Sequence, residues 1–511
     1  MGVPEGPDPN GNALPPDLEQ ARINQSIADL ERLGRERPKC FRGFWSEVCF
    51  CLSIFMSQIL AEYYISGSNV LLPTLVEELD LPAASAIWPS TALSLVVTST
   101  LLIFGRMTDM FGGYLIYNSG ALWLTISSIL CGVSQTWLML IICRALQGFG
   151  LAAFLPSGIM ILGSTYRPGP RKNIVFSIYG ACAALGFFVG IFFSGLCGEY
   201  LTWRWYFFFG AILSAITTAL ASFSIPRDYH EKKNNGIKMD WAGACLSVPA
   251  AVLIVFPIAD SSYAPQGWKT PYIPLFLALG LILLGAMIYV EGWVVENPLL
   301  PGDIFHVRYM TPLVIALLFL YGTLGIFMLY AVLYMSDVMG ASPMQIVAWC
   351  APMGVGGLIL NNSDDVLMPR LCGIWIVLCC HPPGGNYWAF VFPSMICGTI
   401  GIDISFNLAN VFITTNLPKA RQGLAGALIN CTLHMGIAVM LGFADITQTQ
   451  TEELGTRKSY KAVFWYQTGL AILGLLIVVF FVRIREAKSE MTIDEREAMA
   501  AEENGRVGET A

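Results

Sequence analysis

The sequence predicts an all-α integral membrane protein in which about fourteen helices cross the bilayer. Of its 511 residues, 55% are hydrophobic and only 13% are charged, whereas a soluble domain carries about 25% charged residues. The apolar residues gather into runs of about twenty, the length that a helix needs to cross a bilayer. Because a helix satisfies its own backbone hydrogen bonds, these runs are predicted to be membrane helices.

Charge and motif content exclude several other classes of protein. The formal net charge of -7 argues against a nucleic-acid partner. The 14 cysteines lie mostly inside apolar runs, and no spacing of Cys and His is that of a zinc site. The sequence contains no P-loop, HExxH or GxSxG motif. We therefore expect neither an enzyme nor an ATP-driven pump, and no bound metal or cofactor.

The first half of the chain predicts a tail followed by six helices. Residues 1–44 are polar and end in several arginines and a lysine, which is typical of a cytoplasmic tail before an uncleaved first span. An N-terminal six-helix bundle is predicted over residues 45–226. Its apolar runs are 48–65, 87–105, 113–133, 137–162, 174–197 and 205–226.

The second half predicts two additional helices and a further bundle. A hydrophilic cytoplasmic linker, 227–240, precedes two extra spans within 241–296, whose apolar runs are 241–259 and 272–290. The C-terminal bundle is predicted over 297–482, before a charged cytoplasmic tail over 483–511. Its apolar runs are 313–335, 344–360, 371–380, 387–413, 423–444 and 462–482.

The run 371–380 is short for a span, because at 1.5 Å per residue it covers about half of a 30 Å hydrocarbon core. Counting it as a span keeps most lysines and arginines on the cytoplasmic side, whereas omitting it exports the C-terminal tail. The positive-inside rule therefore favours fourteen spans. Three interpretations of 361–386 stay open: a re-entrant or thinned segment, a loss of residues, or a wrongly predicted exon boundary.

The turn between the second and third runs, 105–114, is the first candidate motif. Gly105 and Gly112 allow two helices to approach closely, and Asp109 can cap a helix N-terminus or pair with a basic group. The turn thus predicts a helix contact at the cytoplasmic side.

The fourth run contains an arginine, Arg144, followed by Gln147, Gly148 and Gly150. An arginine inside a span is costly, and such residues are usually functional and face the protein interior. We therefore expect Arg144 to be buried and to serve transport.

The fifth run carries spaced glycines, including Gly186, Gly190 and Gly195. Small residues at such spacings let membrane helices pack backbone to backbone. Close packing and a gating role are both compatible with this pattern.

These three stretches together resemble signatures of the major facilitator superfamily. The turn resembles its loop signature G-x-L-A-D-R-x-G-R, although Met110, Gly113 and Tyr114 replace the basic residues of that signature. The fourth run resembles R-x-x-Q-G-x-G. The fifth resembles the glycine-rich antiporter signature, although Ile191 replaces its proline.

Further features resemble the fungal fourteen-spanner drug:proton antiporters, which include aminotriazole-resistance-like proteins and secondary-metabolite efflux pumps. They are the span count, the sequence 203–207, Asp240-Trp241 and the sequence 297–301. The resemblance implies the major facilitator fold: two six-helix bundles, two extra central helices, and substrate bound between bundles that rock against each other. It also implies a role in proton coupling for Arg144.

Other polar residues inside the runs are candidates for the proton and substrate pathway. Glu62 lies near Tyr64, where bacterial fourteen-spanners carry a carboxylate, and Asp403 shares a helix face with Asn407. His434 can titrate near neutral pH. Arg144 is expected to stabilise the ionised form of Glu62 or Asp403. The predicted pathway residues are Glu62, Arg144, Gln147, Asp403, Asn407 and His434.

The sequence therefore predicts a proton-driven exporter of amphipathic small molecules, such as drugs or a fungal secondary metabolite. We expect a monomer in the plasma membrane with both termini in the cytoplasm; an internal membrane is the alternative. Two other functions stay open: transport of a small inorganic solute such as ammonium or borate, and a membrane protein that no longer transports.

Overall fold

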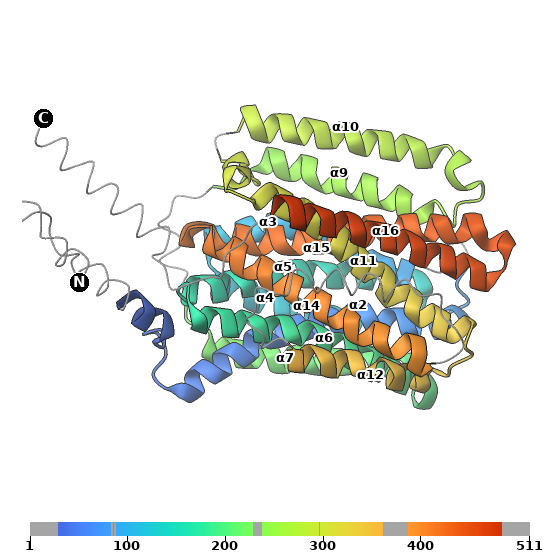
Figure 1. Ribbon diagram of the computed structural model, residues 1–511, viewed down its shortest axis with the longest axis horizontal. Helices are drawn as coiled ribbons and strands as arrows, with labels where there is room; N and C mark the ends of the chain where they lie inside the picture. Colours follow the sequence, from blue (N-terminus) through green and yellow to red (C-terminus); the bar gives the residue numbers. More distant parts are fainter. Residues whose placement is uncertain are drawn as a thin grey trace, which may run out of the picture.

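The computed structural model describes residues 29–82, 85, 88–227, 238–295, 297–360 and 387–482. Within these ranges the chain forms long α-helices that run roughly along one axis (Figure 1). Eleven of the described helices are long and apolar enough to cross a membrane, which makes the chain a multi-pass membrane protein. The end of the bundle at which α2 begins is called the proximal end, and the opposite end the distal end.

Six helices form the N-terminal half, and each overlaps one predicted run, although α2 continues to Glu78, well beyond its predicted run 48–65. They pack tightly because α2 lies along α6, and α4 lies along α5. Gly112 has a φ of 89°, a conformation that favours glycine, and so allows the sharp turn between the second and third runs. The helices are α2 (Phe44–Glu78), α3 (Trp88–Phe111), α4 (Gly113–Gly132), α5 (Trp137–Thr165), α6 (Pro170–Tyr200) and α7 (Trp203–Ser224).

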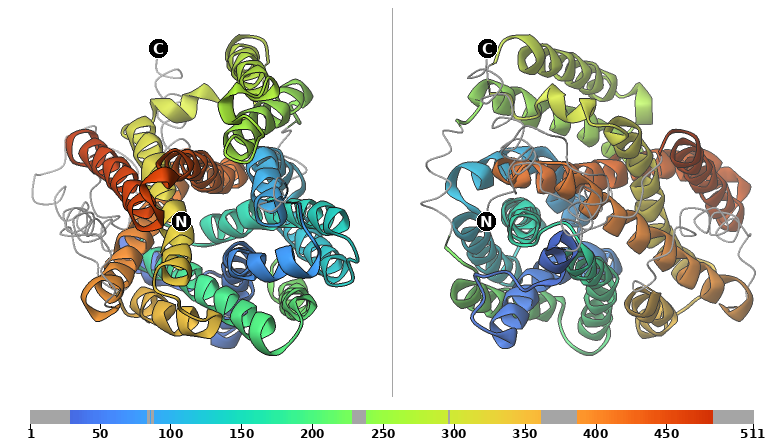
Figure 2. Two further views of the ribbon diagram at one scale, coloured as in Figure 1. Left: turned by 90° about the vertical axis from the view of Figure 1, so that its right-hand side faces the viewer. Right: turned by 60° about the vertical axis from the view of Figure 1, so that its left-hand side comes forward.

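Two further helices form an antiparallel hairpin at the edge of the bundle (Figures 1 and 2). They are α9 (Trp241–Asp260) and α10 (Tyr272–Trp293). The hairpin is attached through α9, which packs against α3 and α15, whereas most side chains of α10 are not buried. These are the two extra helices that the sequence predicted.

The C-terminal half contains five described long helices, several of them longer than their predicted runs. The helix that covers 423–444 continues seven residues further, to Thr451. The long helices are α11 (Met310–Asp337), α12 (Pro343–Leu360), α14 (Phe392–Thr415), α15 (Gln422–Thr451) and α16 (Thr456–Phe481). Short helical turns lie at Gly267–Lys269, Gly302–His306, Tyr387–Val391, Lys419–Arg421 and Glu452–Leu454.

The predicted short span 371–380 falls in 361–386, outside the described residues. On either side of it, α12 and α14 both run from the distal toward the proximal end. Near the distal end Met344 of α12 contacts Glu199 of α6, and at the proximal end Thr414 accepts a hydrogen bond from Gln422. These directions are those that fourteen spans require, and the span count stays a prediction.

Candidate functional site

Arg144 lies at the centre of a hydrogen-bond network in the N-terminal half. Its side chain is fully buried. The guanidinium donates to the carbonyl oxygens of Pro89 at 2.8 Å and Tyr64 at 2.9 Å, and to Gln147 Oε1 at 2.9 Å. No carboxylate among the described residues forms an ion pair with it. Carbonyl dipoles therefore solvate this charge, and burial of Arg144 agrees with the sequence prediction.

The network closes through residues of α2 and α4. Gln147 Nε2 donates to Ser128 Oγ at 2.9 Å, and that hydroxyl lies 2.7 Å from the Tyr64 hydroxyl. The backbone and the side chain of Tyr64 thus both contact the network, where relatives were expected to carry a carboxylate. Sequence reasoning missed Ser128, because its role depends on α4 lying beside α5.

Glu62 lies on α2 against α6, and its side chain is half-buried. Its Cβ would be 3.0 Å from a Cβ added at Gly186, so the two helices are close there. In the part of the chain that the structure describes, no hydrogen bond or ion pair engages the Glu62 carboxylate. Tyr179 of α6 is buried and near enough to interact with it electrostatically.

The structure does not pair Arg144 with Glu62 as the sequence analysis expected. Backbone carbonyls and Gln147 already occupy the guanidinium. The side chain of Asp403, the other expected partner, lies outside the described residues. The coupling role of Arg144 therefore stays a prediction, and this conformation contains no Arg144–Glu62 ion pair.

The polar face of α14 contacts the N-terminal half. Asn407 Nδ2 donates to Ser177 Oγ of α6 at 2.7 Å. The second amide, Asn410, is fully buried and donates to the Phe406 carbonyl. Both side-chain carbonyl oxygens are buried without a partner among the described residues. The contact between Asn407 and Ser177 places α14 directly across the interface between the halves.

His434 and Asn430 lie one turn apart on α15. Both are buried, and Asn430 Nδ2 donates to the Gly426 carbonyl at 2.9 Å. His434 Nε2 and Asn430 Oδ1 have no partner in the described part of the chain. Unpartnered buried polar atoms are costly, so these two sites are available to a further ligand or to water.

Asp109 joins the two halves at the proximal end. Its carboxylate accepts hydrogen bonds from the backbone N–H groups of Gly423 at 2.7 Å and Leu424 at 2.9 Å, at the start of α15. A Cβ at Gly105 would collide with Ala427 of the same helix. The motif turn thus caps a helix N-terminus, which is one of the two predicted uses of Asp109.

The remaining motif glycines lie at close helix contacts. A Cβ at any of these positions would lie within 3.0 Å of a neighbouring helix. Gly148 faces α3 and Gly150 faces α4. Gly186 and Gly190 both face α2, and Gly195 faces α12. Close packing, one of the two roles expected for the glycines of the fifth run, is therefore observed, and a gating role stays a prediction.

Two further carboxylates contribute to buried networks that sequence reasoning missed. Asp445 accepts a hydrogen bond from the Tyr330 hydroxyl at 2.6 Å; it escaped notice because the predicted run ended one residue before it. Glu47, in the first turn of α2, binds both Arg37 and Arg171 and accepts from Tyr166. Burial raises the pKa of the Tyr166 hydroxyl, which therefore stays protonated and donates.

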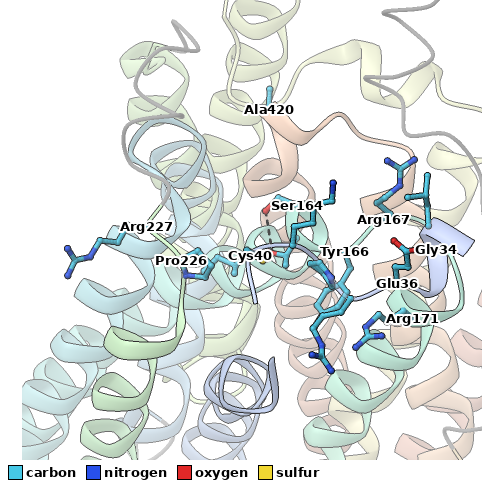
Figure 3. A pocket seen from close by; sticks show the side chains of 16 residues that line it. Gly34, Glu36, Cys40, Ser164, Tyr166, Arg167, Arg171, Pro226, Arg227 and Ala420 are labelled. Carbon is cyan, nitrogen blue, oxygen red and sulfur yellow. Dashed lines mark hydrogen bonds between the residues drawn. The ribbon is translucent and has the colours of Figure 1, made fainter. Parts of the chain in front are cut away.

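A cavity of about 650 Å³ opens at the proximal end. Arg167, Arg171 and Glu36 lie on one side of it and Arg227 on the other (Figure 3). Ala420, which precedes α15, also lines it, so both halves of the molecule contribute. Of the predicted pathway residues whose side chains the structure describes, none lines this cavity.

Comparison with known families gives one match to most of the chain. The model described as Major Facilitator Superfamily matches residues 54–442. In structure, the proton:xylose symporter XylE is similar with a TM-score of 0.61 at 13% identity, over 88% of this chain and 98% of that chain. This likeness concerns the fold.

Curated relatives include fungal transporters. The efflux pump terJ of Aspergillus terreus is 27% identical over 90% of this chain and 92% of its own length. The low affinity ammonium transporter of Saccharomyces cerevisiae is 30% identical, over 80% of this chain and 83% of its own. The aminotriazole resistance protein of the same yeast is 28% identical, over 90% of this chain and 89% of its own length.

Proposed function

Since the chain belongs to the major facilitator superfamily, whose members are membrane transporters and not enzymes, we propose that it is a proton-driven exporter of amphipathic small molecules. The observation that carries the proposal is the Glu62 carboxylate. It lies in a membrane helix and has no ion-pair partner among the described residues. A carboxylate in such a place faces the protein interior and is suited to binding and releasing a proton during transport.

Substrate is proposed to bind between the two halves, close to Glu62 of α2, Asn407 of α14 and His434 of α15. Asn407 already contacts α6 across the interface. Such a site lies within one chain, so we expect a monomer to suffice. Alternation then requires the contacts at the proximal and distal ends to open in turn.

The test measures efflux of a fluorescent amphipathic cation from cells that lack their own drug pumps, with and without a protonophore. We expect efflux that the protonophore stops. Glu62→Gln is expected to abolish net efflux while exchange of substrate across the membrane continues, since the substitution removes the titratable group and keeps the shape. Protonophore-sensitive efflux by Glu62→Gln at the wild-type rate would refute the role of Glu62.

Asp445→Asn provides the matched control. Asp445 is also a buried carboxylate in a membrane helix, but the Tyr330 hydroxyl already engages it within the C-terminal half. We expect this variant to retain proton-driven efflux. An equal loss in both variants would indicate general damage instead of a specific coupling role.

A second candidate substrate is a small inorganic solute, because one curated relative is an ammonium transporter at 30% identity. Uptake and efflux of radiolabelled methylammonium in the same cells distinguish the two functions. We expect no methylammonium transport above the level of cells without the protein. Methylammonium transport without cation efflux would favour the alternative.

We also propose that the proximal end faces the cytoplasm and that the protein resides in the plasma membrane. The arginines that line the proximal cavity support this orientation, since basic residues concentrate on the cytoplasmic side. Epitope tags on either terminus are expected to be reached by antibody only in permeabilised cells. Surface labelling of intact cells through an introduced cysteine in the loop between α9 and α10 tests the plasma-membrane assignment.

A further inference from the structure

Two carboxyl groups meet at the proximal base of the α9–α10 hairpin. Asp240 precedes α9, and its Oδ1 accepts a hydrogen bond from the Gly243 N–H at 2.8 Å, so it caps the helix. Glu291 lies in the last turn of α10, and its Oε2 accepts from the Leu300 N–H at 3.1 Å. Each carboxyl group therefore uses one oxygen to fasten the backbone.

The remaining oxygen of each group is buried and without a partner in the described part of the chain. These atoms are Asp240 Oδ2 and Glu291 Oε1, and the two side chains are only 4% and 9% exposed. Both oxygens border the same point: a Cβ at Gly243 would lie 2.8 Å from Glu291 Oε1 and closer still to Asp240 Oδ2. The two unpartnered oxygens thus face one small space.

The surrounding charges do not neutralise the pair. Arg106 of α3 is buried nearby, but it donates to the backbone carbonyls of Lys238 at 3.0 Å and Asn297 at 3.4 Å. Asp109 caps α15. Among the described residues, Arg421 is near enough to act on Arg106, but it pairs with Asp303 at 2.6 Å. Lys238, two residues before Asp240, is exposed.

We propose that Asp240 and Glu291 together bind one proton, held as an O–H···O hydrogen bond between Oδ2 and Oε1. Two ionised carboxylates in one buried site repel each other and lack solvation. A proton taken from the proximal solvent reduces the charge of the pair by one and gives each unpartnered oxygen a partner. On release, the proton returns to the same solvent.

A metal cation fits this site less well. Calcium takes six to eight oxygen ligands and magnesium needs an octahedral set, whereas the side chains here offer two free oxygens. The Arg106 guanidinium also lies close enough to Asp240 to interact with its charge, and it would oppose the two charges of a divalent cation more strongly than the single charge of a proton. A proton needs only the two oxygens.

The shared proton would make attachment of the hairpin sensitive to pH. The Asp240–Glu291 pair joins the start of α9 to the end of α10, and Glu291 also binds the backbone of Leu300. Arg106 of α3 binds the backbone of Asn297 in the same segment. This site lies outside the proposed substrate pathway, so the inference does not rest on the proposed function. Loss of the proton adds a buried negative charge and is expected to loosen the junction.

Infrared difference spectroscopy of the full-length protein in lipid nanodiscs tests the inference, with the proton itself as the probe. Between mildly acidic and mildly alkaline buffer, we expect the wild-type protein to lose one carboxyl carbonyl band. That band should be missing from the difference spectra of Glu291→Gln and Asp240→Asn. An Asn at 240 still caps a helix, so the fold is expected to persist.

Asp260→Asn is the matched control at the other end of the same hairpin. Asp260 is buried too, but its carboxylate accepts from the Tyr272 hydroxyl at 2.7 Å, so the band should persist in this variant. A difference spectrum that Glu291→Gln and Asp240→Asn leave unchanged would overturn the proposal. So would thermal stabilisation of the wild-type protein by sodium at constant pH that Glu291→Gln abolishes.

Discussion

The two halves of the molecule contact each other at both ends, and the two contacts use the same chemistry at different depths. At the proximal end, the buried Asp109 carboxylate accepts two backbone N–H groups at the start of α15. At the distal end, the exposed Glu199 carboxylate accepts one, from Met344 at the start of α12, at 3.3 Å. In each case a carboxylate of the N-terminal half meets a helix N-terminus of the C-terminal half.

Because of this difference in burial, the proximal and distal contacts are expected to differ in strength. A charge-assisted hydrogen bond contributes about 1.5–3 kcal/mol when water is excluded, whereas an exposed charge at a helix terminus contributes typically 0.3–1 kcal/mol. The proximal end is therefore the more strongly fastened of the two. In the proposed transport cycle, opening of the proximal contact is expected to need more free energy from substrate or proton binding than opening of the distal contact.

The largest effect is expected from Asp109→Ala, which removes the proximal acceptor. Two buried N–H groups of α15 would lose their partner, at a cost of about 3 kcal/mol. Thermal unfolding of the purified protein should show a clear drop in melting temperature, with Asp109→Asn intermediate because it keeps one acceptor. Equal melting temperatures for wild type and Asp109→Ala would remove the basis of the comparison.

A matched pair of glycine substitutions probes packing at the two ends. A Cβ at Gly426 would lie 2.6 Å from the Pro156 carbonyl, which is backbone, whereas at Gly195 it would lie 2.9 Å from a methyl group of Val347. Since a side chain yields more easily than backbone, Gly426→Ala should destabilise by about 2 kcal/mol and Gly195→Ala by less. Unfolding curves of the two variants decide this, and the reverse order would contradict it.

The third prediction is that Glu199→Gln at the distal end changes stability by no more than about 0.5 kcal/mol. The effect should vanish at high salt, because exposed charges are screened. Melting temperatures in low and high salt measure this. A loss as large as that of Asp109→Ala would show that the distal contact is buried in another state of the protein.

The smallest effect is expected from Asp303→Asn, which breaks the ion pair with Arg421 just before α15. Although this pair is at the proximal end, both side chains are more than one third exposed, and such pairs contribute little. Asp303 and Asp109 both contact the segment at the start of α15, but only Asp109 is buried. Comparing the stability losses of their variants therefore separates the effect of burial from that of position. A melting-temperature loss similar to that of Asp109→Ala would mean that location matters more than burial.

Much of the fold could be predicted from the sequence because a membrane helix requires an apolar run of about twenty residues, which is visible in the sequence. All six runs of the N-terminal half and both extra helices fall on observed helices. The role of Asp109 as a cap was also foreseeable from the motif turn, but its partner α15 was not, since spacing along a chain does not reveal which helices adjoin.

The candidate site was less predictable for the same reason. Burial of Arg144 followed from its place in an apolar run, yet its partners are the carbonyls of Pro89 and Tyr64, and no sequence pattern distinguishes those from a carboxylate. Asp445 was missed because hydropathy placed the end of its run one residue early. The unpartnered oxygens of Asp240 and Glu291 emerge only when α9 and α10 are packed together.

The exposed hairpin has a consequence for how the protein senses its surroundings. The α10 helix has 22 residues, which at 1.5 Å per residue gives a length of about 33 Å, close to the thickness of a typical hydrocarbon core. Few of its side chains are buried in the protein, so we expect α10 to contact mostly lipid, whereas the bundle helices fix one another's tilt. In a thinner bilayer, mismatch is therefore relieved first by tilting of α10. The tilt of α10 is therefore expected to change with bilayer thickness more than that of the bundle helices, and α9 would pass such a change on to α3.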